Sequence, residues 1–190
     1  MNGNNKFKTT DLVYIAICAV MLAVCSWISI PTAVPFTMQT FGVFCVLLLL
    51  GGKRGTLAIV VFLLLGAIGL PVFAGFSGGM GSILGSTGGY LLGFIFIGLI
   101  YWITEALLLR TQGSPASRTA AKISALIVGL AVCYAFGTAW FMTVYAKQTG
   151  PIGLGTALGW CVLPFIIPDL VKLAIAVPVS ARLSKAIKLQ

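Results

Sequence analysis

The chain has 190 residues, of which 59% are apolar and only 8% are charged. An ordinary soluble domain is about 45–50% apolar and about 25% charged. Twelve Lys or Arg and three Asp or Glu residues are too few to cover the surface of a soluble globule of this size. A membrane-spanning helix needs about 20 apolar residues. The composition therefore predicts an all-α integral membrane protein and leaves no room for a soluble catalytic domain.

The residue types also exclude several kinds of chemistry. The chain contains no histidine, which is the commonest metal ligand and the commonest general base. Asp11 and Asp169 are the only aspartates, which argues against an aspartyl dyad. The basic, glycine-rich segment 51–55 lacks the spacing of a nucleotide-binding loop. We therefore predict no catalytic residue, no metal site and no cofactor, and any ATP that drives this protein must be hydrolysed by another subunit.

Five cysteines lie in apolar segments, and none forms a C-x-x-C pair. This pattern predicts small buried side chains and no disulfide framework. The residues concerned are Cys18, Cys25, Cys45, Cys133 and Cys161.

Charges and helix breakers divide the single membrane domain, residues 1–190, into six transmembrane helices. A short interfacial or re-entrant helix is predicted at about 155–163. The sixth span is predicted to begin at Pro168, because proline suits the first turn of a helix. The predicted spans are 12–30, 38–52, 56–73, 88–109, 123–146 and 168–187.

The basic residues predict the orientation of these spans. Ten of the twelve lie at the two termini, in the loop after the second span and in the loop after the fourth. On the other side only Lys147 is basic, and Lys172 lies inside a span. Basic loops favour the cytoplasmic side. We therefore expect cytoplasmic termini in a multi-pass protein of a prokaryotic-type cell membrane.

The outer loops, 31–40 and 71–87, carry no charge. Irregular backbone at membrane depth is tolerated where protein or a cavity surrounds it. Apolar residues such as Phe76 and Ile83 interrupt the glycines of the second loop. A flexible spacer is the alternative for a Gly/Ser-rich tract. The apolar residues favour loops that fold over a ligand site.

Asp169 and Lys172 are unusual because they lie within an apolar segment. A charge at the centre of a membrane helix costs roughly 2.5–3.5 kcal/mol. The i, i+3 spacing places both side chains on one helix face, and a start at Pro168 would put Asp169 in the first turn, where the helix dipole favours an anion. We predict a polar anchor for a ligand that enters from the outer side. The alternative is a mutually neutralising pair that fixes helix packing. Glu105, about one turn from Arg110, is interpreted as a solvated boundary residue.

Four motifs in this order resemble the BioY family, the biotin-binding S components of energy-coupling-factor (ECF) transporters. They are residues 35–42 (PFTMQTFG), 69–75 (GLPVFAG), 85–93 (GSTGGYLLG), and 163–165 (LPF) together with 168–172 (PDLVK). The resemblance covers nearly the whole chain. It implies a six-helix bundle that binds one biotin near the outer face and has no hydrolytic activity. It also implies that a transmembrane coupling subunit and two ATPase subunits of an ECF module drive uptake.

The resemblance and the chemistry of biotin together give a candidate ligand set. Asp169 would accept a hydrogen bond from a ureido N–H, and Lys172 would orient Asp169 or donate to the ligand. Gln39, Thr37 and Tyr90 would complete the polar set, since a small cavity with a few convergent polar groups is the usual solution for such a ligand. The predicted walls are Phe36, Phe73, Gly88 and Gly89.

The resemblance also points to small residues on the first helix as the docking surface for the coupling subunit. Ala16, Ala19 and Ala23 match a small-x-x-x-small pattern, which lets helix backbones approach closely in lipid. The alternative is that alanine is simply common in membrane helices.

Three other functions stay open at this point. One is an S component for another vitamin, such as thiamine or riboflavin. Another is a self-sufficient transporter or channel, although channels usually need a polar pore stripe or charged rings. The third is a purely structural membrane subunit.

Overall fold

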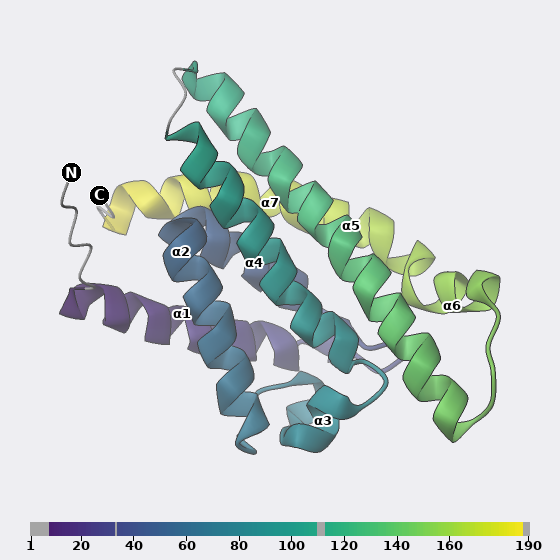
Figure 1. The fold of residues 1–190 in the computed structure, drawn as a ribbon. Helices are drawn as coiled ribbons and strands as arrows, with labels where there is room; N and C mark the ends of the chain where they lie inside the picture. The colour runs from purple at the N-terminus through teal and green to yellow at the C-terminus, as the bar shows by residue number, and fades with distance from the viewer. Residues whose placement is uncertain (1–7, 33, 110–112, 188–190) are drawn as a thin grey trace.

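The computed structural model describes residues 8–32, 34–109 and 113–187, and helices dominate it (Figure 1). A two-stranded antiparallel hairpin pairs Ser29 with Thr37 and Ile30 with Phe36. The elements in chain order are α1 (Thr9–Trp27), β1 (Ser29–Ile30), β2 (Phe36–Thr37), α2 (Gln39–Ala67), η1 (Ala74–Phe76), α3 (Met80–Leu84), α4 (Gly88–Leu108), α5 (Pro115–Gln148), α6 (Leu154–Cys161) and α7 (Leu163–Ile187).

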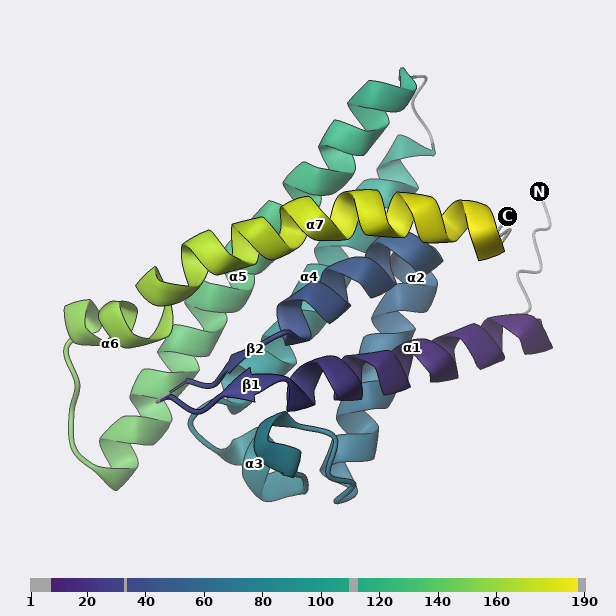
Figure 2. The same ribbon diagram turned by 180° about the vertical axis from the view of Figure 1, so that it is seen from behind.

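Helix α2 consists of two arms (Figure 2), and they meet at Gly51. Gly51 has φ 76° and ψ 174°, a backbone conformation that favours glycine. The next residue, Gly52, lies against α4, where an added Cβ would be 2.3 Å from the Cα of Trp102. The two arms correspond to the second and third predicted spans. A bend at one glycine replaces the predicted connection at 53–55, and the second arm ends at Ala67 instead of residue 73.

The predicted start of the last helix was wrong. Helix α7 begins at Leu163, so Pro164 occupies its first turn, and Pro168 lies inside the helix. Proline within a membrane helix is tolerated where neighbouring groups satisfy the freed carbonyl. Asp169 is therefore more than one turn inside the helix, and the dipole of the first turn does not explain its charge. The short helix predicted at 155–163 corresponds to α6, at Leu154–Cys161.

Helix α2 is the centre of the packing, because it contacts α1, α4 and α7, while α4 packs along α5. Phe44 and Phe62, one on each arm of α2, are fully buried in this core. The five cysteines are all buried and free, as predicted. Within the described residues, five helices are long and apolar enough to cross a membrane. The all-α membrane fold class is therefore confirmed, whereas the number of spans and the cytoplasmic termini stay predictions.

Two acidic side chains contact the residues that follow the bend of α2. Glu105 of α4 accepts a 2.5 Å hydrogen bond from the backbone N–H of Gly52 and forms a 3.2 Å ion pair with Lys122 of α5. Asp11 of α1 forms a 3.1 Å ion pair with Arg54. The interpretation of Glu105 as a solvated residue was therefore wrong, since its carboxylate caps the second arm of α2. Arg110, its expected neighbour, lies outside the described residues.

The hairpin and the segment that contains η1 and α3 gather at the other end of the bundle (Figure 2). The indole Nε1 of Trp27 donates a 2.8 Å hydrogen bond to the carbonyl of Pro71, and its ring stacks on Phe76 with centroids 5.1 Å apart. These contacts tie the end of α1 to the second outer loop. The loop is therefore a packed segment, as the sequence predicted.

Candidate ligand-binding site

A cavity of about 250 Å³ lies beneath the hairpin and the second outer loop. Both loops contribute to its wall, and so do α2, α4, α5, α6 and α7. The aromatic and aliphatic part of the wall includes Phe73, Leu91, Phe94, Leu130 and Phe165. The polar residues below the loops are Thr37, Gln39, Thr40, Tyr90, Tyr134, Asp169 and Lys172, and the loop after Phe73 adds Ser77, Ser82, Ser86 and Thr87. Such a cavity suits a small, mostly apolar ligand that carries a few hydrogen-bonding groups.

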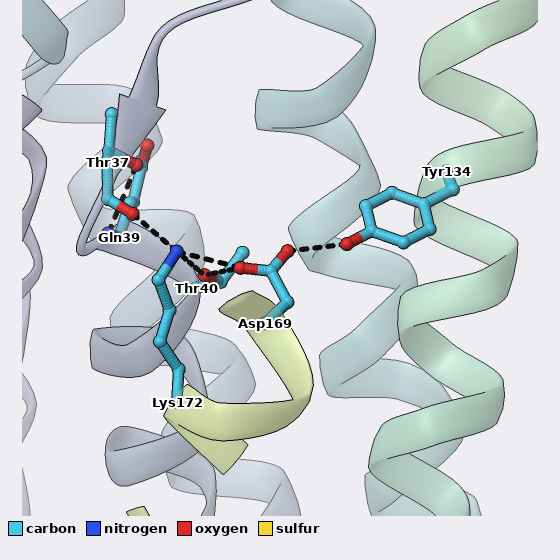
Figure 3. A network of polar contacts seen from close by, with 6 residues as sticks. All are labelled: Thr37, Gln39, Thr40, Tyr134, Asp169 and Lys172. Carbon is cyan, nitrogen blue, oxygen red and sulfur yellow. Dashed lines mark hydrogen bonds and ion pairs between the residues drawn. The ribbon is translucent and has the colours of Figure 1, made fainter. Parts of the chain in front are cut away.

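The carboxylate of Asp169 is 1% exposed and lies at the centre of the polar network in Figure 3. Its Oδ1 accepts hydrogen bonds from Lys172 Nζ at 2.7 Å and from Thr40 Oγ1 at 2.8 Å. Its Oδ2 accepts one from the hydroxyl of Tyr134 at 2.5 Å. A carboxylate offers about four acceptor positions. One position on Oδ2 therefore stays available to a donor in the cavity.

Lys172 is held more completely than Asp169. Its Nζ donates to the Thr37 carbonyl at 2.7 Å, to Thr40 Oγ1 at 3.1 Å and to Asp169 at 2.7 Å. An ammonium group has three N–H donors, so all of them are used within the protein. The ammonium also lies 4.4 Å from the centre of the Phe36 ring, where a cation–π contact is favourable. Lys172 thus neutralises and orients Asp169, and it has no spare donor for a ligand.

Gln39 and Tyr90 differ in what they offer to the cavity. Gln39 is 4% exposed, and its Nε2 has no hydrogen-bond partner within the part of the chain that the structure describes. A buried donor without a partner is costly, so this amide is available to an acceptor on a ligand. The hydroxyl of Tyr90 is already paired with Thr138 Oγ1 at 2.9 Å.

Three predicted wall residues lie outside the cavity lining. Phe36 stacks on Phe165, with centroids 5.7 Å apart, behind Lys172. An added Cβ at Gly88 would lie 1.7 Å from the Ile83 carbonyl oxygen, and one at Gly89 would lie 2.3 Å from Trp140 Cβ. The two glycines therefore let α4 pack closely against α3 and α5.

Phe73 does line the cavity, as predicted. It is 2% exposed and packs edge-on against Phe62, with centroids 5.4 Å apart. An added Cβ at Gly66 would lie 1.9 Å from its ring, so the glycine makes room for the aromatic wall.

Three hydroxyl residues of the network were missed. Thr40 bridges Lys172 and Asp169 although it lies inside a motif that had been recognised. Tyr134 and Thr138 lie four residues apart on α5, and this spacing places them on one helix face. A polar pair at that spacing in an uncharged span was the available signal.

The predicted docking alanines do not share one surface. Ala19 and Ala23 are 1% and 4% exposed and lie in the core, whereas Ala16 is exposed. The prediction of an outward surface was therefore wrong for Ala19 and Ala23. Small side chains on the inner face of α1 allow its close approach to α2.

Comparison with known proteins gives a consistent result. The sequence model of the BioY family matches residues 1–189. The biotin transporter BioY of Thermotoga maritima is 38% identical over 176 residues, which is 92% of this chain and 96% of that protein. The probable biotin transporter BioY of Pyrococcus horikoshii is 36% identical over 177 residues, 93% of this chain and 97% of that protein. The fold also matches the crystal structure of an S component for biotin from an ECF-type ABC transporter, with a TM-score of 0.77, 30% identity, and coverage of 97% of this chain and 95% of the other.

Proposed function

Because this chain belongs to the BioY family, we propose that it captures biotin from the outer side of the cell membrane and mediates its uptake as the substrate-specific subunit of an ECF-type transporter. The similar proteins are biotin transporters and a biotin S component. The chain is a transport component and not an enzyme.

One observation in the cavity carries the proposal. A free acceptor position on Asp169 and an unpartnered donor on Gln39 line the same cavity. The ureido group of biotin presents N–H donors beside a carbonyl acceptor. Asp169 would therefore accept a ureido N–H, and Gln39 Nε2 would donate to the ureido carbonyl. The first bond would fill a spare acceptor position on a carboxylate that the protein already holds in place, and the second would pair a buried donor that has no partner among the described residues. Buried polar groups that need a partner select a ligand in this way.

The remaining residues fit supporting roles. Lys172, Thr40 and Tyr134 fix the position and charge of Asp169 through their hydrogen bonds. Thr37 holds Lys172 through its backbone carbonyl. Phe73 supplies an apolar wall for the fused rings and the aliphatic chain of biotin. In this arrangement the Asp169–Lys172 pair serves both ligand binding and the packing of α7 against α2.

We further propose that a transmembrane coupling subunit and two ATPase subunits of an ECF module drive the uptake step. The sequence contains no nucleotide-binding motif, and the solved structure that it matches is an S component of such a transporter. Ala16 is the one exposed member of the three alanines first considered for docking, so it is the candidate contact on α1.

The test is identification of the ligand by mass spectrometry on the full chain, purified from cells without added vitamin. We expect bound biotin. Thiamine or riboflavin in its place would contradict the substrate assignment and would favour an S component for another vitamin. As a matched control, Asp169→Asn protein prepared in the same way should carry much less biotin than the wild type.

A further inference from the structure

A second hollow lies on the outside of α5, away from the biotin cavity. It has a volume of about 440 Å³. One face of α5 forms the floor of this groove, and Leu84 at the end of α3 forms a side wall. The residues from α5 are Phe136, Ala139, Trp140, Thr143, Val144 and Lys147. At 1.5 Å per residue the groove extends about 16 Å along the helix.

The polar atoms along most of this groove are already satisfied. The indole Nε1 of Trp140 donates to the Gly85 carbonyl at 3.0 Å, and Thr143 Oγ1 donates to the Ala139 carbonyl at 2.8 Å. Trp140 therefore presents its ring to the groove. Phe136 is braced by Phe96 of α4, with centroids 5.0 Å apart. The groove is thus a preformed apolar surface along most of its length.

Lys147 lies at one end of the groove, in the last turn of α5. It is exposed, and no ion pair joins it to any described residue. It is also the only charged residue between Lys122 and Asp169, so the nearby sequence supplies no acidic partner. The helix dipole favours a cation in the last turn, but it does not account for an apolar groove that leads to that cation.

We propose that this groove binds an anionic phospholipid, whose acyl chain lies against Phe136, Trp140 and Leu84 and whose phosphate pairs with Lys147. Charge complementarity selects this occupant, because the groove combines apolar walls with a lysine that forms no ion pair to a described residue. A lysine at the membrane surface can extend its ammonium to the headgroups while its stem covers apolar surface. Attraction between one such lysine and an anionic lipid is about 1 kcal/mol, or roughly fivefold in affinity.

The groove also shares a wall with the loop above the biotin cavity. The Gly85 carbonyl that holds Trp140 belongs to a residue that lines that cavity. Lipid binding is nevertheless a separate property, because Lys147 does not contribute to the biotin cavity.

Native mass spectrometry of the full chain, titrated with phosphatidylglycerol or with phosphatidylcholine of the same acyl chains, tests this proposal. We expect the wild type to retain phosphatidylglycerol more strongly. Lys147→Gln should lower that retention about fivefold. Lys185→Gln makes the same change at an exposed position of α7 and should leave the groove lipid in place. Ala139→Phe fills the groove without changing the charge and should also displace the lipid.

Equal retention of the two lipids by the wild type would overturn the proposal. So would retention by Lys147→Gln at the wild-type level. A dimer that Lys147→Gln or Ala139→Phe dissociates would assign the groove to a second copy of the chain and would equally contradict lipid binding. Biotin affinity, measured on the same variants, should stay at the wild-type value.

Discussion

The hydroxyl of Tyr134 on α5 donates a 2.5 Å hydrogen bond to Oδ2 of Asp169 on α7. This bond links α5 to α7 (Figure 3) through two side chains that line the cavity. It leaves one acceptor position on Oδ2 for a ligand. Tyr134 thereby acts as a positioning residue for the carboxylate. The bond gives the site a fixed geometry before biotin arrives.

Loss of this bond is expected to weaken biotin binding. Tyr134→Phe keeps the ring but removes the donor, so the carboxylate of Asp169 can rotate away from the ligand. Hydrogen bonds to charged groups contribute about 1.5–3 kcal/mol, and we expect at least a fivefold rise in the Kd for biotin. Calorimetric titration measures this change. Tyr145→Phe on the same helix, outside the cavity lining, is the control, and equal affinities of the two variants would remove Tyr134 from the site.

Substitution of Gln39 should lower biotin affinity without lowering the stability of the ligand-free protein. Its Nε2 is buried without a partner among the residues described, so replacing the amide by an apolar group removes a desolvation cost. We therefore expect Gln39→Leu to lower biotin affinity about tenfold, while the melting temperature of the ligand-free protein stays the same or rises. Thermal unfolding and titration of one preparation give both quantities. A lower melting temperature with unchanged affinity would mean that Gln39 is a packing residue only.

In contrast to Gln39, Glu105 should contribute to stability and not to biotin binding. Its carboxylate caps Gly52 and pairs with Lys122, and none of these three residues lines the cavity. Glu105→Ala leaves the Gly52 N–H without its acceptor, and we expect a loss of about 1–3 kcal/mol in the free energy of unfolding. Glu105→Gln keeps an acceptor for that N–H and should lose less. Denaturation of the three proteins in one detergent tests this order. Equal stability of both variants and the wild type would contradict the role of the cap.

Docking of the coupling subunit on the exposed face of α1 can be tested by a substitution that reduces uptake but not biotin binding. A bulky side chain at Ala16 would prevent close approach of a partner helix without reaching the cavity. We expect Ala16→Trp to reduce biotin uptake in cells that contain the ECF module, with unchanged affinity in the purified protein. Ala131→Trp places the same bulk on an exposed position of α5 and serves as the control. Normal uptake by Ala16→Trp would exclude this part of α1 from the docking surface.

The sequence predicted the membrane fold and the Asp169–Lys172 pair because charges in an apolar chain are rare and each demands a reason. Hydroxyl groups carry a weaker signal, even as a pair at helical spacing, since threonine and tyrosine occur in many membrane helices. Thr40 and Tyr134 were therefore found only when the structure brought three helices together.

Other errors have equally specific causes. A pattern of small residues shows that another helix can approach closely, but not which helix does so. Ala19 and Ala23 were therefore assigned to a docking surface for a partner, although they pack inside the bundle. The preference of proline for the first turn applied to Pro164 instead of Pro168. Gly88 and Gly89 belong to a recognised motif, yet their role in helix packing depends on contacts with Ile83 and Trp140, which the motif itself does not indicate.

The most direct test of the account is the titration of purified Asp169→Asn with biotin, alongside the wild type. The substitution keeps the volume of the side chain but replaces a charged acceptor with an amide, and it removes the negative charge that pairs with Lys172. We predict a loss of tenfold to a hundredfold or more in affinity, about 1.4–2.8 kcal/mol, in a protein that still inserts and purifies. Wild-type affinity together with a lowered melting temperature would contradict the account, because Asp169 would then be a packing residue and not the acceptor for biotin.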